Sequence, residues 1–182
     1  AGGAGRVGGA GGWGGLGLGD CKTEDALVDA GQDAGAFLIQ YAPITERVIL
    51  ALPGRGLISR IGAGFDTVDT AACARHGVWV ANSPDYGVGE VATHALSLAL
   101  ALIRNVVGYH RDIGAGTWHY LSSGRVRRAS EMTIGIVGLG RIGKRMAHAS
   151  RNVFKRVMAC DPYLIAGDFP ASAGKLIRGL RV

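Results

Sequence analysis

Short apolar runs and segments of helical period alternate along most of the chain, and this alternation predicts an α/β fold. From residue 20 onward the apolar runs are bounded by turn residues, as in buried parallel strands. The pattern predicts strands over 36–40, 57–59 and 78–81 and helices over 23–30, 45–52 and 67–76. Asp66 or Asp69 can cap the third of these helices, and Gly77 can end it where a positive φ is required.

The second half of the chain begins with a long apolar helix. Residues 88–107 are apolar on most of the helix circumference, which predicts burial on more than one side, as at a seam between two domains. A polar and basic connector over 114–128 follows. A second alternating unit then consists of a strand over 133–137, a helix over 141–152 and a strand over 156–160.

The composition adds a glycine-rich leader to this picture. Of the 31 glycines in the 182 residues, 11 lie in the first 19 positions. So many glycines raise the entropy cost of ordering a segment, and we expect residues 1–19 to be a flexible leader. With 48% apolar and 19% charged residues, the chain has the composition of a globular protein.

Apolar stretches and cysteines bear on the location of the protein. The longest apolar stretch, residues 95–103, is far shorter than the roughly 20 residues that cross a bilayer, so no membrane association is expected. Cys21, Cys73 and Cys160 are widely spaced and odd in number, which favours reduced thiols over disulfides or a metal site. We therefore expect a cytoplasmic protein without a bound metal.

The net charge of +6 is unevenly divided along the chain. Residues 1–103 hold 6 basic and 10 acidic side chains, whereas residues 104–182 hold 14 and 4. The basic residues are scattered, and no aromatic side chains are interleaved with them as platforms for stacked bases. Nucleic acid is therefore not an expected partner.

The sharpest motif is a glycine-rich turn, Gly-Leu-Gly-Arg-Ile-Gly, between the strand at 133–137 and the helix after it. In a dinucleotide-binding unit the first glycine permits a tight turn, the second lets the backbone approach a pyrophosphate, and the third permits close helix–strand packing. Asp161 ends the next strand, where such units carry a carboxylate for the adenosine ribose. The candidate cofactor residues are Gly138, Leu139, Gly140, Arg141, Ile142, Gly143 and Asp161.

Asp161 also bears on the choice of cofactor. A carboxylate beside the ribose repels the additional phosphate of NADP, so we expect the cofactor to be NAD. The alternative is that Asp161 only caps or solvates the end of its strand, beside Pro162.

Four further blocks accompany the glycine turn in a specific order and spacing. They are RIGAGFDTVD at 60–69, GV at 77–78 with NSP at 82–84, EVATHAL at 90–96, and DPY at 161–163. Together with GLGRIG at 138–143, they resemble the D-isomer-specific 2-hydroxyacid dehydrogenases. The form of the block at 60–69 also resembles the C-terminal-binding-protein corepressor branch of that family.

The resemblance implies an α/β fold of two doubly wound parallel-sheet domains, one flavodoxin-like and one Rossmann, both incomplete in this chain. Residues 20–103 would be part of the substrate domain, and residues 104–182 would supply the first βαβ unit of the NAD-binding domain. The resemblance also implies that main-chain amides around Ala63 and Gly64 hold the substrate carboxylate. The alternative is an ordinary strand-to-helix turn capped by Asp66. Arg60 is either a cation on the substrate side or a partner in a surface ion pair.

No catalytic residue can be assigned. The arginine, glutamate and histidine of the family's reaction lie in a later part of the NAD domain, and the resemblance ends near Tyr163, so we expect the chain to be a piece of a longer protein. His94 falls in a block where the resemblance implies packing between domains.

Two classes of function remain open. The first is an oxidoreductase that acts on the CH–OH group of a 2-hydroxy acid with NAD as acceptor, with a small 2-hydroxy or 2-oxo acid as partner and a possible homodimer as assembly. The second is a catalytically silent module that binds NAD or another protein, like a corepressor.

Overall fold

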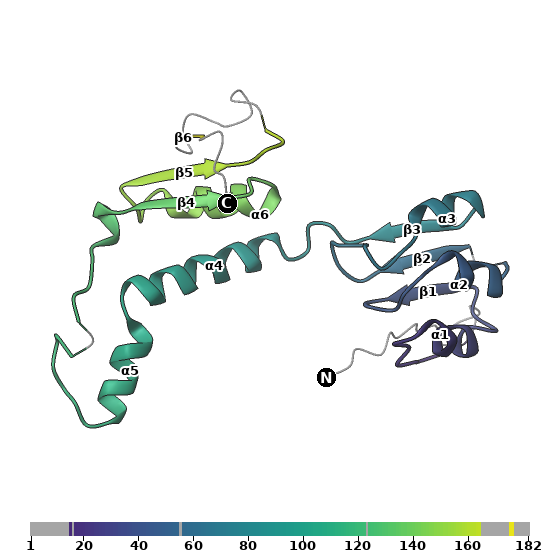
Figure 1. The fold of residues 1–182 in the computed structure, drawn as a ribbon, viewed down its shortest axis with the longest axis horizontal. Coiled ribbons are helices and arrows are strands. Elements are labelled where there is room, and N and C mark those ends of the chain that lie inside the picture. The colour runs from purple at the N-terminus through teal and green to yellow at the C-terminus, as the bar shows by residue number, and fades with distance from the viewer. Residues whose placement is uncertain (1–14, 16, 55, 123, 165–174, 177–182) are drawn as a thin grey trace. The chain divides into compact units, whose positions relative to one another are not determined.

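The computed structural model describes residues 15, 17–54, 56–122, 124–164 and 175–176. The chain forms two compact units, Ala1–Tyr86 and Gly87–Val182. Both contain a parallel three-stranded sheet (Figure 1), so the predicted α/β class with parallel sheets is confirmed.

The first unit places three short helices against its sheet. The strands run in the order β1-β2-β3, and they are β1 (Ala36–Ile39), β2 (Leu57–Arg60) and β3 (Trp79–Asn82). The helices are α1 (Glu24–Ala30), α2 (Glu46–Ala51) and α3 (Thr70–Arg75). All three helices and two of the strands contribute buried side chains to one core, among them Leu27, Ile39, Val48, Ile58 and Ala72.

Side-chain caps fix where these helices begin. The hydroxyl of Thr23 accepts a hydrogen bond from the amide of Ala26 (3.2 Å), and Thr45 does the same for α2. The carboxylate of Asp69 accepts from the amide of Ala72 (2.8 Å), so Asp69 is the cap of α3 and Asp66 is not. Each cap satisfies one of the amides that a helix start leaves unpaired.

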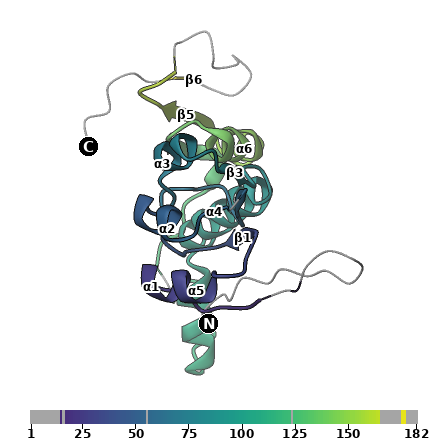
Figure 2. The same cartoon turned by 90° about the vertical axis from the view of Figure 1, so that its right-hand side faces the viewer.

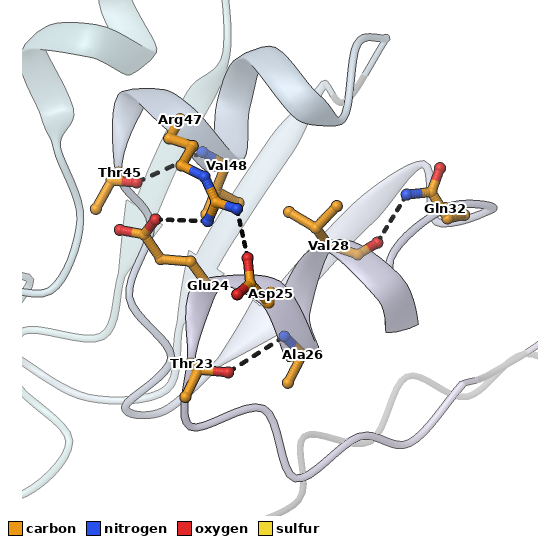
Figure 3. Close-up of polar contacts among 9 residues, drawn as sticks. All are labelled: Thr23, Glu24, Asp25, Ala26, Val28, Gln32, Thr45, Arg47 and Val48. Carbon is orange, nitrogen blue, oxygen red and sulfur yellow. Dashed lines mark hydrogen bonds and ion pairs between the residues drawn. The ribbon is translucent and has the colours of Figure 1, made fainter.

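A cluster of charged side chains joins α1 to α2. Arg47 on α2 pairs with Glu24 (2.9 Å) and also with Asp25, both in the first turn of α1 (Figure 3). The ion pairs lie at the surface, where such pairs contribute at most about 1 kcal/mol. They therefore add little to the stability of the first unit.

The second unit has its own sheet, in the order β4-β5-β6. Its strands are β4 (Thr133–Val137), β5 (Arg156–Cys160) and β6 (Lys175–Leu176), and α6 (Arg141–Ser150) connects the first two. β6 pairs in parallel with β5 (Figure 2). The expectation of a βαβ unit alone is therefore corrected, since a third strand is present. A two-residue strand is too short to show a period in the sequence.

The helix expected over 88–107 is broken. α4 (Val88–Ile103) and α5 (Val106–Gly114) meet at an angle of 59°, because Asn105 adopts a left-handed conformation with φ 48°. Within the described residues no single helix is long and apolar enough to cross a membrane, although this bent pair together has the necessary length and composition.

Within the second unit α4 is partly buried. α4 packs on α6, and this contact places α4 with the second unit, whereas the sequence analysis divided the chain after residue 103. Ala92 is fully buried, but Leu98 and Leu102 are 54% and 81% exposed. His94 is exposed as well, and burial of this helix at a seam between two domains stays a prediction.

Candidate functional site

The turn after β4 needs glycine at its first position. Gly138 has a φ of +91°, in the region that costs other residues roughly 1 kcal/mol or more. Its amide donates to the carbonyl oxygen of Cys160 at the end of β5 (2.8 Å). Gly138 therefore turns the chain out of β4 while it remains tied to the neighbouring strand.

The other two glycines of the motif have opposite surroundings. A β-carbon on Gly143 would lie 2.0 Å from the carbonyl oxygen of Gly138, so only glycine allows α6 to approach the turn this closely. A β-carbon on Gly140 would meet nothing within 4 Å. The backbone at Gly140 thus faces open space at the start of α6.

The first turn of α6 is suited to an anion. Gly140 caps the helix without a side-chain hydrogen bond, and the first turn contains no acidic residue, whereas α1 and α2 begin with acidic residues. In the described part of the chain, nothing accepts a hydrogen bond from the amides of Ile142 and Gly143. Such unpaired amides, with the helix dipole, form an anion-binding site.

Asp161 ties the glycine turn to the end of β5. One carboxylate oxygen accepts from the amide of Leu139 (2.6 Å) and the other from the amide of Tyr163 (2.9 Å). These two hydrogen bonds, with a smaller contribution from Lys144, lower the pKa of Asp161 below its usual value. Asp161 therefore does cap the end of its strand, which was the alternative to ribose binding. Each carboxylate oxygen still has a lone pair that can accept from another donor.

A second candidate turn follows β2 in the first unit. The carbonyl oxygens of Gly62 and Ala63 are held by β3 and the residue after it: Ser83 donates its amide to Gly62 (3.0 Å), and Asn82 donates its side-chain amide to Ala63 (2.8 Å). Ala63 and Gly64 are exposed, and their own amides donate to no group among the described residues. The carbonyl oxygens of this turn are thus hydrogen-bonded, whereas its amides at Ala63 and Gly64 are available to a ligand. Such a turn is suited to an anion.

Asn82 is a candidate site residue that sequence reasoning missed, because its block was used only for the family resemblance. The missed signal is the order of the parallel strands. β2 and β3 are neighbours in register, with Arg60 opposite Asn82, so the carboxyl ends of both strands meet at one edge of the sheet.

Arg60 has no carboxylate partner in the part of the chain that the structure describes, so the predicted surface ion pair is not found there. Its Nε donates to the carbonyl oxygen of Gln40 (3.2 Å), and its guanidinium lies 5.8 Å from the ring centre of Tyr41.

The described residues hold no group of three or more side chains that could bind a metal ion. Cys21, Cys73 and Cys160 are free thiols. Burial and the charge of Asp69 raise the pKa of Cys73, which keeps this thiol protonated and unreactive at neutral pH.

A parallel β-α-β unit with this glycine turn is of the dinucleotide-binding class. Residues 18–162 match the profile of the D-isomer specific 2-hydroxyacid dehydrogenase, catalytic domain. The chain belongs to this family.

Curated relatives agree with this assignment. The D-3-phosphoglycerate dehydrogenase of Mycobacterium tuberculosis is 34% identical over 158 residues, which cover 86% of this chain and 29% of the relative. The glycerate dehydrogenase of Methylorubrum extorquens is 29% identical over 147 residues, or 78% of this chain and 46% of the relative. The chain thus spans less than half the length of these relatives.

Solved structures share the fold. The D-lactate dehydrogenase from Aquifex aeolicus, complexed with NAD and lactic acid, superposes with a TM-score of 0.71 at 23% identity, over 86% of this chain and 45% of that one. The NAD-dependent formate dehydrogenase from Staphylococcus aureus, in complex with NAD, gives a TM-score of 0.69 at 27% identity, over 83% and 46%. The relatives named here are dehydrogenases, and the resemblance to the corepressor branch stays a prediction.

Proposed function

We propose that this chain supplies the NAD-binding turn and the substrate-carboxylate turn of an oxidoreductase that acts on the CH–OH group of a 2-hydroxy acid with NAD as acceptor. The observation that carries the proposal is the glycine turn of the second unit, with an open Gly140 and unpaired helix amides. Membership of the dehydrogenase family supports the same reaction class.

The residues of the glycine turn fit a dinucleotide. The amides of Ile142 and Gly143 would bind the pyrophosphate, Gly140 would let it approach the backbone, and Asp161 would accept from the ribose hydroxyls. NAD, when bound, supplies the hydride acceptor. Leu139 and Arg141 complete the turn, and the buried side chain of Leu139 anchors it (1% exposed).

The amides of Ala63 and Gly64 would bind the carboxylate that all 2-hydroxy and 2-oxo acids share. Charge-assisted hydrogen bonds from two backbone amides orient such a group without a charged side chain. We propose no catalytic acid or base within this chain.

We also infer a homodimer in the cytoplasm, without nucleic acid as partner. The exposed apolar side chains of α4 and α5, which include Leu102 and Val107 (81% and 73% exposed), support a contact with a second copy. Three free thiols support a reducing compartment. A purely monomeric species in sedimentation equilibrium at micromolar concentration would contradict the dimer.

Thermal protection tests the proposed cofactor. A ligand that binds only the folded state raises the melting temperature by mass action, so NAD should protect the chain and NADP should protect it less. D161N should reduce this discrimination. Asp29, exposed on α1, provides the matched control D29N, which should behave like the unchanged chain. Equal protection by both cofactors in the unchanged chain would refute the assignment.

A further inference from the structure

The side chain of Arg60 folds back over its own turn. A β-carbon on Gly62 would lie 1.6 Å from one terminal nitrogen of the Arg60 guanidinium, so the guanidinium occupies the place that any larger residue at 62 would fill. Gly62 also has a φ of +144°, which a residue with a β-carbon adopts only with strain.

Arg60 connects this turn to the end of β1. Its Nε donates to the carbonyl oxygen of Gln40 (3.2 Å), and Tyr41 lies beside the guanidinium. The backbone supports the same junction, because the amide of Ile61 donates to Ile39 (2.8 Å). The guanidinium of Arg60 thus packs against Gly62, and the amide of Ser83 donates to the carbonyl oxygen of Gly62.

We propose that Arg60 is a positioning residue for the turn that binds the substrate carboxylate. By packing against Gly62 and binding Gln40, the guanidinium fixes the turn in the conformation that leaves the amides of Ala63 and Gly64 unpaired. This inference rests on the proposed function of that turn. In this role the planar guanidinium of Arg60 supports the turn by packing and hydrogen bonding. It does not contact the substrate.

The two roles of an arginine here make opposite predictions for lysine. Lysine keeps the positive charge but lacks the planar group that lies against Gly62 and binds Gln40. If Arg60 attracts the carboxylate by charge, R60K retains binding and R60M loses it. If Arg60 positions the turn, both substitutions fail alike.

The experiment uses the isotope-labelled 182-residue chain titrated with pyruvate. Amide chemical shifts of Ala63 and Gly64 report binding, and their hydrogen exchange without pyruvate reports the order of the turn. We expect R60K and R60M to speed this exchange and to weaken pyruvate binding about tenfold. R75M, which removes an exposed arginine paired with Glu46, is the matched control and should change neither quantity.

The outcomes separate the inference from the proposed function. Binding retained in R60K, or unchanged exchange in R60M, overturns the positioning role. If pyruvate leaves the Ala63 and Gly64 amides of the unchanged chain unaffected, the proposed substrate turn fails, whereas the exchange rates still decide the role of Arg60. Should R60M lose protection in β2 as well, R60Q supplies the second test, because it removes the charge but keeps a planar amide donor for Gln40. R60Q should then exchange more slowly at Ala63 and Gly64 than R60M does, and equal exchange in the two variants overturns the positioning role.

Discussion

Gly140 and Gly143 lie three residues apart, yet the structure assigns them different reasons to be glycine. Gly143 avoids a collision inside the fold, because a β-carbon there would lie 2.0 Å from a backbone oxygen. Gly140 avoids nothing in the chain itself. Its lack of a side chain leaves the backbone at the start of α6 open to a ligand, as the proposed NAD site requires.

Paired alanine substitutions test this difference. G143A should destabilise the second unit by about 1–3 kcal/mol, as other overpacked sites do, because the clash outweighs the helix-propensity gain of about 1 kcal/mol. G140A should cost less than about 1 kcal/mol, because alanine is a poorer N-cap than glycine, but should weaken NAD binding at least tenfold. Denaturant unfolding and NAD titration measure the two effects. A destabilised G140A that still binds NAD would contradict the assignment.

We expect Asp161 to make the proposed NAD-binding turn sensitive to acid. Because the hydrogen bonds from Leu139 and Tyr163 lower its pKa in the folded chain, its contribution to stability is complete above the unfolded pKa of about 3.9. That contribution is lost as the pH falls through the lower folded pKa.

We therefore expect NAD affinity, compared with that of D161N at each pH, to be constant from neutral pH down to about the ordinary carboxyl pKa of 3.9. It should fall only at lower pH, as the pH drops through the lowered folded pKa of Asp161. D161N should bind weakly at every pH and show no such fall. Affinity that declines between pH 7 and pH 6 would point to a histidine instead of Asp161.

At the scale of elements, capping decides where α3 begins. Asp69 binds the amide of Ala72 and is the cap of α3, whereas Asp66 is not. We expect D69A to lower the free energy of unfolding of the first unit by about 1 kcal/mol, the usual cost of a lost cap. D66A, a matched loss of one carboxylate, should change it by less than about 0.5 kcal/mol. Equal effects of the two substitutions would show that charge, not capping, is at work.

Elements with a strong period or a capping residue could be predicted from the sequence. β4 and β5 have the expected bounds, because an apolar run ends at a glycine turn in one case and at Asp161 in the other. The break between α4 and α5 could not be predicted, since it depends on a left-handed Asn105 inside a pattern that continues apolar. β6 is too short to show any pattern.

The candidate sites were predictable to a different degree. The glycine turn was found because each glycine has a defined conformational reason that spacing reveals. The contacts of Arg60 and Asn82 were not, because they depend on which strand ends are neighbours in the sheet. The carboxyl ends of β2 and β3 lie together because these strands are parallel neighbours in the sheet. The pattern of a single sequence does not reveal which strands are neighbours.

At the scale of the whole molecule, each compact unit contains one proposed anion-binding turn at the carboxyl end of its parallel strands. In open α/β sheets ligands bind at this edge. Ala63 and Gly64 belong to the first unit, and the glycine turn belongs to the second. The account therefore predicts two separate ligands for the chain, a carboxylate and a dinucleotide.

Hydrogen exchange with and without NAD tests the central claim most directly, because it locates the bound cofactor along the chain. NAD should slow exchange of the amides of Ile142 and Gly143 and of the turn from Gly138 onward, while β1 to β3 exchange as before. G140A should abolish this protection. If NAD leaves exchange at Gly138 to Gly143 unchanged, or protects another segment instead, the turn is not its binding site.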